Sequence, residues 1–470
     1  MSMCLASLVL SALCLAANPP ARGYICAEGG GSIRGGTWAS SVFHWMTEKG
    51  RFGSVAILGT APPDAELEQV FLREGAACVS SLAITRGNAD DPAIYHDIAV
   101  ANVVWIRGGD QSRYVNFWND TLTERAIQHV YRSGGVVGGT SAGCAVLGDV
   151  IYDARVASLA PRQALRDAYH PNLTLTSDFL NLTPDVLFDT HFTERGRLGR
   201  LVVMLARCFA DLHRDVLGIG VDHRTAFCIA PDLIAEVRGE GSVTILQRTA
   251  ATQQIVERGS PPVVTDLRYT QLIEGYRYDL TRREILARPA SARNVPESDD
   301  QLSFQAARIN GDQRADAAKG DVQVIDDGDK DALTAGRLKL TDGEHLLHRT
   351  IISTQTWQGD FVENRVGGPQ YALARHPHFL GLYLDEGVGI CTAAPALLSV
   401  EAATEPQSAL IILDTAGMTR AAFATAHSQR DNANPRQSVG IESAVLHVLR
   451  AGWQFNAAAH AVIGPPPAPE

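Results

Sequence analysis

Short apolar segments alternate with longer amphipathic segments along the first half of this 470-residue chain. Residues 53–58 (GSVAIL) and 103–106 (VVWI) have the continuous apolar character of buried strands. Helices are predicted over 64–74, with Asp64 as the N-cap, and over 124–132, and glycine follows each of them. This alternation predicts an α/β fold with a doubly wound, mostly parallel sheet in a flavodoxin-like three-layer sandwich.

Candidate chemistry is expected in the loops after these strands, because open parallel sheets bind ligands beyond the carboxyl ends of their strands. A glycine-rich segment at 138–143 (GGTSAG) follows a further apolar pair. Glycines on both sides of Ser141 let the backbone turn sharply and expose the hydroxyl, as in a nucleophile elbow. The Ala142 amide is then one oxyanion donor, and the loop after the preceding strand offers a second near Gly109. The alternative is a plain glycine-rich turn without chemistry.

A histidine follows the next predicted strand, which covers 185–189 (DVLFD). We expect His191 to lie beside Ser141 at the rim of the same sheet, as its general base. The alternative is a histidine that only caps the strand. Three arginines follow, namely Arg195, Arg197 and Arg200. Their spacing does not form one simple ion-pair ladder, so they are either a cluster that binds an anion or a solvated helix face that pairs with Glu194 or Asp211.

Three motifs together resemble the cyanophycinase family of peptidases, relatives of aspartyl dipeptidases: GGDQ at 108–111, GTSAG at 139–143 and DTHFTERGRLGRL at 189–201. The resemblance implies a serine exopeptidase that releases β-aspartyl-arginine dipeptides from the storage polymer cyanophycin. It implies Ser141 as the nucleophile and His191 as the base. It also implies a substrate pocket that contains Gln111, Asp189, Thr193, Arg195, Arg197 and Arg200. In such a pocket the arginines hold substrate carboxylates, and the acids receive the substrate guanidinium.

One position departs from the family pattern. The family usually ends a Gly-Ile-Asp-Glu strand with the glutamate that orients the histidine, whereas 218–223 (GIGVDH) ends in Asp222 and His223. His223 takes the glutamate position, and Asp222 points to the opposite face unless the register shifts. Because loss of the orienting acid costs orders of magnitude in rate, three outcomes are open. These are a weakened enzyme, an acid supplied from elsewhere, and a homologue that binds peptides or is structural.

The C-terminal region has the pattern of a degenerate partial copy of the half that follows the serine. Residues 380–386 (LGLYLDE) match 217–223, and residues 444–457 match 267–280, in the same order along the chain. We therefore predict a partial repeat over 332–463.

The predicted repeat lacks the parts of a second enzyme. No serine motif precedes it, and Thr356 or Trp357 stands where the histidine would be. It does contain an acid pair, Asp385 and Glu386. Either the repeat is a degenerate lobe in which Glu386 is structural, or it docks against the first domain and contributes Glu386 to the pocket.

The motifs, the partial repeat and the local composition together predict five segments along the chain. A secretory signal over 1–23 precedes a peptidase domain over 24–287, and a polar linker or insertion over 288–331 connects this domain to the repeat. A proline-rich tail covers 464–470. The signal depends on the apolar run at 5–17, which is too short to span a membrane, and the alternative is a buried N-terminal element. A signal predicts a secreted or periplasmic protein.

Composition narrows the choice of partners. The formal net charge of -11 and the pI near 5.7 argue against a nucleic-acid surface and weakly favour a cationic substrate. The eight cysteines show no metal-ligand spacing. We expect a peptide substrate, β-aspartyl or arginine-rich, and no metal, organic cofactor, nucleic acid or membrane partner. The family resemblance also implies a homodimer, although the added lobe could cover the surface that it would use.

Overall fold

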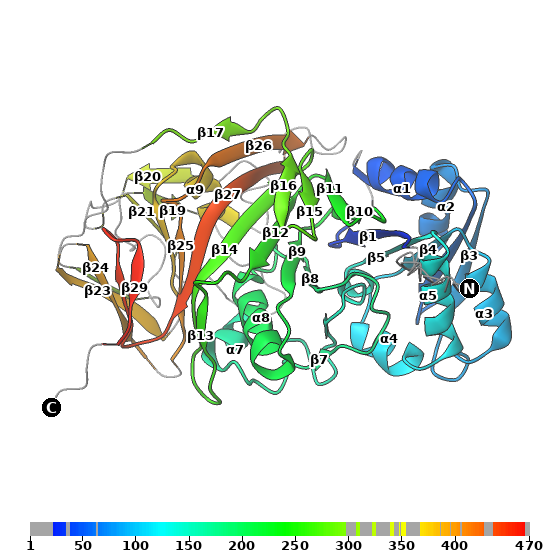
Figure 1. The fold of residues 1–470 in the computed structure, drawn as a ribbon, viewed down its shortest axis with the longest axis horizontal. Helices are drawn as coiled ribbons and strands as arrows, with labels where there is room; N and C mark the ends of the chain where they lie inside the picture. The colour runs from blue at the N-terminus through cyan, green and yellow to red at the C-terminus, as the bar shows by residue number, and fades with distance from the viewer. Residues whose placement is uncertain are drawn as a thin grey trace, which may run out of the picture.

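The computed structural model describes residues 22–33, 38–62, 64–297, 307–310, 322–325, 339–342, 347, 349–353, 367–385, 387–394, 396–404, 407–426 and 436–465. Two large sheets organise these residues, one of nine strands and one of thirteen. The nine-stranded sheet and its helices form the right-hand part of Figure 1, and the thirteen-stranded sheet runs through the centre to the left.

The nine-stranded sheet is parallel in one half and antiparallel in the other. Its order is β16-β15-β11-β10-β1-β5-β4-β2-β3. These strands are β1 (Tyr24–Glu28), β2 (Ser54–Gly59), β3 (Cys78–Ala83), β4 (Val103–Ile106), β5 (Val136–Thr140), β10 (Thr225–Ile229), β11 (Ile234–Gly239), β15 (Arg277–Asp279) and β16 (Glu284–Ala287). Strands β1 to β5 pair in parallel, whereas β10 joins β1 antiparallel and the remaining strands continue that way. The prediction of a mostly parallel sheet therefore holds only for β1 to β5.

Helices cover both faces of the parallel half. These helices are α1 (Trp38–Lys49), α2 (Ala65–Arg73), α3 (Pro92–Ala99), α4 (Gln111–Trp118) and α5 (Leu122–Arg132). Val55 and Ile57 of β2 pack in the cluster that contains α1 and α2, while Ala56 and Leu58 pack in the cluster that contains α3, α4 and α5. Successive side chains of a strand point to opposite faces, so this segment is buried on both sides and forms a three-layer unit.

The local helix predictions agree with the structure. Asp64 is the N-cap of α2, and its carboxylate accepts hydrogen bonds from the backbone amides of Glu66 and Leu67. The helix predicted over 124–132 begins slightly earlier, at Leu122. Side-chain capping therefore sets the start of α2.

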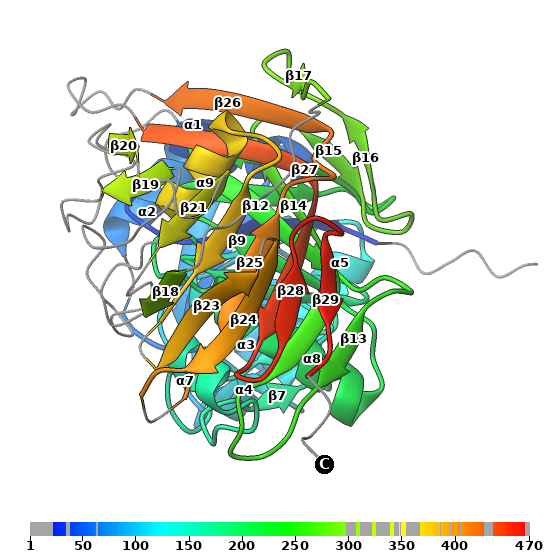
Figure 2. The same ribbon diagram turned by 90° about the vertical axis from the view of Figure 1, so that its left-hand side faces the viewer.

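The thirteen-stranded sheet contains strands from two parts of the chain, which we call the first half (residues 22–297) and the second half (residues 307–465) (Figure 2). Its main path is β20-β19-β21-β22-β25-β27-β14-β12-β9-β8, and β13, β17 and β26 pair off this path. From the first half come β8 (Val186–Thr190), β9 (Leu217–Val221), β12 (Ser242–Gln247), β13 (Gln253–Ile255), β14 (Val263–Ile273) and β17 (Arg293–Asn294). From the second half come β19 (Val322–Ile325), β20 (Lys339–Asp342), β21 (Thr350–Ser353), β22 (Leu380–Tyr383), β25 (Leu410–Asp414), β26 (Arg420–Ala426) and β27 (Arg436–Leu449).

The remaining elements are short or belong to a smaller sheet. They are α6 (Ala142–Ala145), α7 (Pro161–Arg166), α8 (Leu198–Leu212), α9 (Gly367–Arg375), and the strand pair β6 (Ile151–Tyr152) and β7 (Leu175–Thr176). A five-stranded sheet has the order β18-β23-β24-β28-β29. It consists of β18 (Ala307–Asn310), β23 (Val388–Ala394), β24 (Leu397–Ala402), β28 (Gln454–Asn456) and β29 (Ala461–Ile463).

Strand pairing follows the same order in the two halves. β9 pairs in parallel with β8 and antiparallel with β12, and β22 pairs in parallel with β21 and antiparallel with β25. Gly275 follows β14 with a φ of 92°, and Gly452 follows β27 with a φ of 86°. These glycines are the ones that the sequence match aligns. Of the positions singled out in the predicted repeat, Thr356, Trp357 and Glu386 lie outside the described residues.

The two halves pack directly against each other. One apolar cluster contains Leu187 and Tyr269 from the first half together with Ile411 and Leu446 from the second. At the centre of the shared sheet, β14 and β27 pair antiparallel. The C-terminal lobe therefore completes the core of the thirteen-stranded sheet.

A buried ion pair also joins the two halves. Nε and a terminal nitrogen of Arg162 on α7 each donate to the Asp385 carboxylate at 2.8 Å, and Asp385 is fully buried. This ion pair anchors the C-terminal lobe to α7.

Three short strands, β17, β18 and β19, fall within 288–331, the segment for which the sequence predicts a polar linker or insertion. Of the predicted signal over 1–23, only residues 22 and 23 are described. Among the helices of the described residues, none is long and apolar enough to cross a membrane.

Candidate active site

The carboxyl ends of strands from the two large sheets face each other across the candidate site. Ser141 follows β5 of the nine-stranded sheet, whereas His191 follows β8 of the thirteen-stranded sheet. His223 comes shortly after β9, the parallel neighbour of β8, so it emerges at the same edge as His191. The prediction that Ser141 and His191 share one sheet is therefore wrong, because β8 pairs with β9 and not with β5.

Ser141 occupies the sharp strand-to-helix turn that the sequence predicts. Its φ of 54° and ψ of -116° are unusual for a residue with a side chain. The Ser141 amide donates to the Glu28 carbonyl at 3.0 Å, which fixes the turn against β1. Gly143 permits the turn, because a Cβ there would lie 2.1 Å from the Ile106 carbonyl oxygen. Backbone strain of this kind is common where a side chain must be presented for chemistry.

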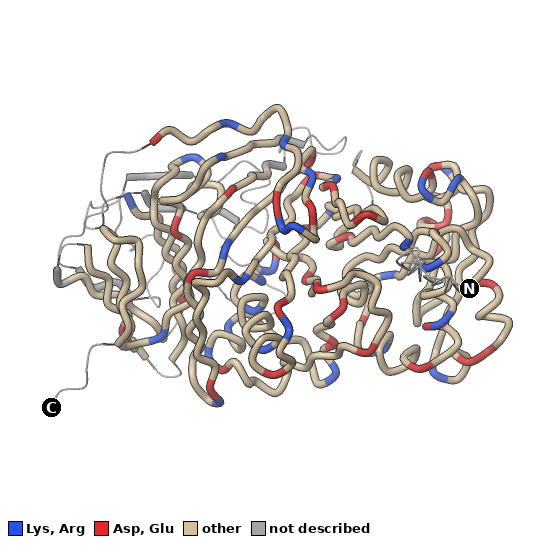
Figure 3. Tube along the Cα trace, viewed as in Figure 1, with Lys and Arg blue, Asp and Glu red and all other residues tan. Residues whose placement is uncertain are grey.

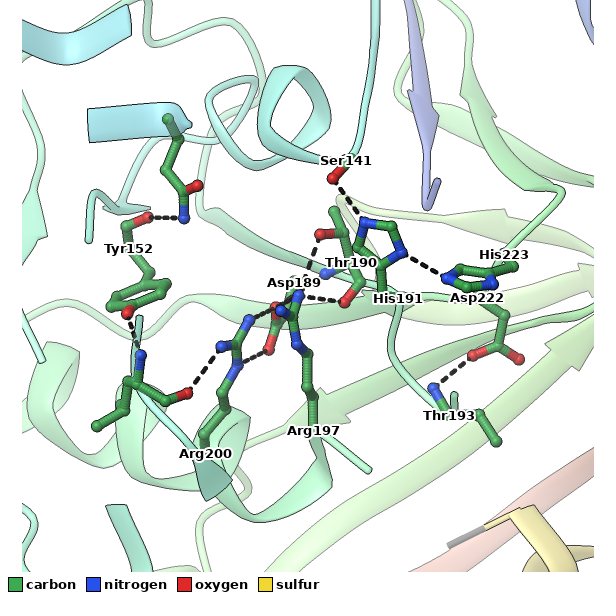
Figure 4. A network of polar contacts seen from close by, with 12 residues as sticks. Ser141, Tyr152, Asp189, Thr190, His191, Thr193, Arg197, Arg200, Asp222 and His223 are labelled. Carbon is green, nitrogen blue, oxygen red and sulfur yellow. Dashed lines mark hydrogen bonds and ion pairs between the residues drawn. The ribbon is translucent and has the colours of Figure 1, made fainter. Parts of the chain in front are cut away.

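A chain of hydrogen bonds connects Ser141, His191 and His223 (Figure 4). The Ser141 Oγ lies 2.6 Å from Nε2 of His191, and Nδ1 of His191 lies 2.5 Å from Nε2 of His223. A neutral imidazole has one donor and one acceptor nitrogen. If His191 accepts the serine proton at Nε2, its Nδ1 carries hydrogen and donates to His223.

A loop of three glycines packs against both histidines. The His191 amide donates to the Gly29 carbonyl at 2.8 Å. Gly30 has a φ of 112°, and a Cβ there would lie 2.3 Å from the imidazole Cε1 of His191. A Cβ on Gly31 would lie 3.1 Å from the Cβ of His223. Only a backbone without side chains can approach the two rings this closely.

Burial and positive charge act together on the base. His191 is 8% exposed. Burial lowers its pKa far below the ordinary histidine value, and Arg197, Arg195 and His223 lower it further. His191 is therefore neutral over the whole physiological pH range, which is the protonation state that a base requires.

Asp189 neutralises two of the three arginines in the basic segment. Arg200 donates from Nε to Asp189 Oδ2 at 2.8 Å and from a terminal nitrogen to Oδ1 of the same carboxylate. Arg197 donates to the Thr190 carbonyl at 2.6 Å and lies 3.4 Å from Asp189 Oδ1. All three charged side chains are buried. Although burial opposes the effect, Arg200 and Arg197 hold the pKa of Asp189 below its usual value.

The sequence interpretation did not include the pairing of Arg197 and Arg200 with Asp189. Asp211 pairs with Arg207 instead, and Glu194 contacts His223. Arg197 and Arg200 thus form an internal ion-pair cluster, while Arg195 is half-buried at the start of the same segment.

Asp222 and His223 point in different directions, as the alternation along the strand predicts. The Asp222 Oδ1 accepts the Thr193 amide at 2.9 Å, and its Oδ2 accepts the Ser242 amide at 2.9 Å. Asp222 therefore holds the loop after β8, whereas His223 takes the place beside His191.

Three further predicted positions are Gln111, Gly109 and Ala142. Gln111 is the first residue of α4, and its side chain donates to the Tyr152 carbonyl at 3.4 Å. The loop before α4 runs past the serine, because a Cβ on Gly108 would lie 3.4 Å from the Ser141 Cβ. Gly109 has a φ of 152°, and Ala142 begins α6. The two backbone segments predicted to hold an oxyanion thus both border Ser141.

The structure places one acid in the site that the sequence interpretation missed. Glu28 ends β1 and is 2% exposed, and its Oε1 accepts the Gly30 amide at 2.9 Å. Burial raises the pKa of Glu28 to about 8, although hydrogen bonds from Thr140 and Gly30 oppose the rise. Its position at the carboxyl end of a parallel strand was the signal that could have found it.

The strand-turn-helix serine and its hydrogen-bonded histidine define the chain as a serine hydrolase of the α/β class. The model of peptidase family S51 matches residues 64–229. The chain is 31% identical over 251 residues to a cyanophycinase from Trichormus variabilis, an alignment that covers 50% of this chain and 80% of the relative. It is 29% identical over 246 residues to a cyanophycinase from Synechococcus elongatus, covering 50% and 72% of the two chains.

The chain therefore belongs to peptidase family S51, the cyanophycinase family, and it is a serine peptidase. Among solved structures it is similar to a peptidase from an acI-B1 Actinobacterium, with 19% identity and a TM-score of 0.40. That match covers 55% of this chain and 98% of the other.

Proposed function

We propose that this chain is a secreted, cyanophycinase-like serine exopeptidase that hydrolyses β-aspartyl-arginine or related peptides through an acyl-enzyme on Ser141. The observation that carries the proposal is the 2.6 Å contact between Ser141 Oγ and His191 Nε2. This contact lies within a chain whose relatives are cyanophycinases. The cyanophycinase name of those relatives supports a β-aspartyl-arginine polymer as the substrate class.

The first half-reaction forms the acyl-enzyme. Ser141 Oγ attacks the scissile carbonyl carbon while its proton passes to His191 Nε2. The carbonyl oxygen becomes an oxyanion, which the Ala142 amide and an amide near Gly109 stabilise. The C–N bond then breaks, and the leaving amine takes the proton from His191. The acyl group remains on Ser141 as an ester.

Water completes the cycle. It loses a proton to His191 Nε2 as its oxygen attacks the ester carbon. The ester C–O bond breaks, the proton returns from His191 to Ser141, and the free acid leaves. The two attack steps need the neutral imidazole that burial and the neighbouring arginines favour, and the two bond-breaking steps use the proton that His191 has accepted.

A second candidate function is a catalytically impaired homologue that binds such peptides or is structural. It is favoured by one observation, which is that an imidazole instead of a carboxylate lies 2.5 Å from His191 Nδ1. In serine hydrolases the acid at this position stabilises the imidazolium that forms during catalysis. The two functions differ in turnover, not in the geometry of Ser141.

Substrate recognition is proposed for the residues around the His191 loop. Arg195 and Gln111 are half-buried, so we propose that they contact substrate carboxylates and the peptide. Asp189, Arg197 and Arg200 shape the pocket as one ion-pair cluster, and Thr193 borders it. Acidic and basic residues are interspersed along the trace, which supports a small peptide ligand over a nucleic acid (Figure 3).

The C-terminal lobe is proposed to be a degenerate copy of the second half of the peptidase domain. The recurring strand order and the two matched glycines support this origin. Such a lobe, paired through β27 with β14, covers a sheet edge that a second subunit could otherwise use. We therefore propose that the homodimer implied by the resemblance uses a surface other than this edge, and that the segment over 1–23 directs export.

Incubation of the purified protein with cyanophycin tests the proposed function. Mass spectrometry is expected to detect β-aspartyl-arginine dipeptide with the wild type and none with Ser141→Ala. If Ser141 reacts with a serine-directed phosphonate but no dipeptide appears, the impaired homologue is the better description. Absence of both reactions would reject the hydrolase proposal.

A further inference from the structure

Glu194 is an acid that contacts the second histidine of the site. Its Oε1 accepts the backbone N–H of His223 at 3.0 Å, and the same oxygen lies 3.9 Å from the His223 Nδ1. The Glu194 side chain is 14% exposed and the His223 side chain 30% exposed, so water screens the pair only partly. Glu194 is the third residue after His191, which places it in the same loop.

Three arginines also act on His191, although Asp189 pairs with Arg197 and Arg200. Arg195, Arg197 and Arg200 all act to disfavour a protonated ring at position 191. Glu28 does not compensate them at neutral pH, because burial raises its pKa to about 8 and keeps the carboxyl largely protonated. The imidazolium that must form during acylation therefore needs an anion on the side of His223.

Transfer of the Ser141 proton to His191 requires one particular tautomer of each ring. His191 must accept at Nε2 from Ser141, so it donates from Nδ1. His223 must then accept at Nε2, and its own hydrogen must be on Nδ1. That nitrogen is the one that faces Glu194 Oε1.

We propose that Glu194 is a positioning residue that acts on His191 through His223. Its carboxylate holds the hydrogen of His223 on Nδ1, and this makes Nε2 an acceptor for the Nδ1–H of His191. When the Ser141 proton reaches His191, the carboxylate also stabilises the positive charge through the intervening ring. This inference rests on the proposed roles of Ser141 and His191. In this arrangement a carboxylate still acts on His191 although a histidine occupies the position predicted for the orienting acid.

A double-mutant cycle separates this role from a structural one. Glu194→Gln keeps an oxygen that can accept the His223 amide but removes the charge. Its effect is measured in the wild-type background and in the His223→Glu background, where the new carboxylate contacts His191 directly. The readout is the second-order rate constant for phosphonylation of Ser141 by a fluorophosphonate, which does not depend on the natural substrate.

We expect Glu194→Gln to slow phosphonylation about tenfold or more in the wild-type background. In the His223→Glu background the same change should leave the rate unaltered or raise it, because Glu194 then only repels the new acid. The matched control is Glu236→Gln, which removes a carboxylate bound to Arg238 at 2.7 Å and should change neither rate. Equal losses in both backgrounds would overturn the proposal.

A spectroscopic readout tests Glu194 even if the proposed function fails. Nitrogen-15 NMR of the histidine side chains reports which nitrogen of His223 carries hydrogen. The wild type should have it on Nδ1, and Glu194→Gln should shift the ring toward the other tautomer. A wild type that is not phosphonylated would reject the proposed function. An unchanged His223 tautomer in Glu194→Gln would reject the role of Glu194.

Discussion

Nδ1 of His191 and Nε2 of His223 lie 2.5 Å apart, so a second imidazole takes the place where the family resemblance predicts a glutamate. The replacement keeps a hydrogen-bond acceptor for His191 but removes the negative charge from direct contact. Orientation of the base is therefore retained, whereas stabilisation of its charged form becomes indirect.

His223→Glu should raise kcat/KM for peptide hydrolysis about tenfold or more, because a carboxylate stabilises the imidazolium directly. The matched control is His223→Gln, which offers a neutral acceptor of the same length as Glu and should give no gain. Steady-state kinetics on a β-aspartyl-arginine substrate measures both. If the two variants have the same rate, negative charge at this position does not matter and the interpretation is wrong.

The fall of kcat/KM at low pH should begin at a much lower pH than is usual for a histidine base. Burial and three neighbouring arginines lower the pKa of His191, so the base stays neutral well below the ordinary histidine pKa of about 6.5. We expect kcat/KM to remain constant from pH 8 to below pH 6. The same shift makes folding less favourable as pH falls below about 6.5, because the unfolded chain binds the proton more readily. An acid limb centred near the ordinary value would contradict this picture.

Glu28 should make stability depend on pH in the opposite sense. Its folded pKa of about 8 lies above the unfolded value, so its contribution to stability is present at low pH and is lost as pH rises toward 8. The free energy of unfolding should fall by about 3 kcal/mol between pH 5 and pH 8 from this group alone. Glu28→Gln imitates the protonated carboxyl and should remove that slope in urea unfolding. If the free energy of unfolding of Glu28→Gln keeps the wild-type dependence on pH, a group other than Glu28 causes that dependence.

Docking of the C-terminal lobe should depend on the Arg162–Asp385 pair. Asp385→Asn leaves a partly buried guanidinium without its anion and should lower the free energy of unfolding by about 3 kcal/mol. Glu257→Gln removes another pair between the halves, with Arg450 at 2.7 Å, but Glu257 is 56% exposed. Glu257→Gln should lower the free energy of unfolding by about 0.5 kcal/mol or less. Equal losses in the two variants would show that Asp385 has no special role.

The sequence correctly predicted the features that depend only on residues close together along the chain. The Asp64 cap, the strand at 103–106 and the sharp turn at Ser141 follow from capping, apolar runs and glycine placement. The division into two sheets did not follow, because the partner of β8 is decided by long-range pairing. Nothing in the local pattern of 185–189 distinguishes a strand of the first sheet from one of the second.

The candidate site was predicted in position but not in its polar contacts. Ser141, His191 and His223 were identified from motifs, and their order along the hydrogen-bond chain agrees with the structure. The pairing of Arg200 with Asp189 and the contact of Glu194 with His223 were not predicted. Charged residues in a short segment have several candidate partners, and only the path of the loop after β8 selects among them.

The most direct test of the account is the mass of the protein after reaction with a fluorophosphonate. A single adduct is expected, and peptide mapping should place it on Ser141. In His191→Ala the rate of labelling should fall about a hundredfold or more, because no base remains within reach of the hydroxyl. An adduct on another residue, or equal labelling rates with and without His191, would contradict the account.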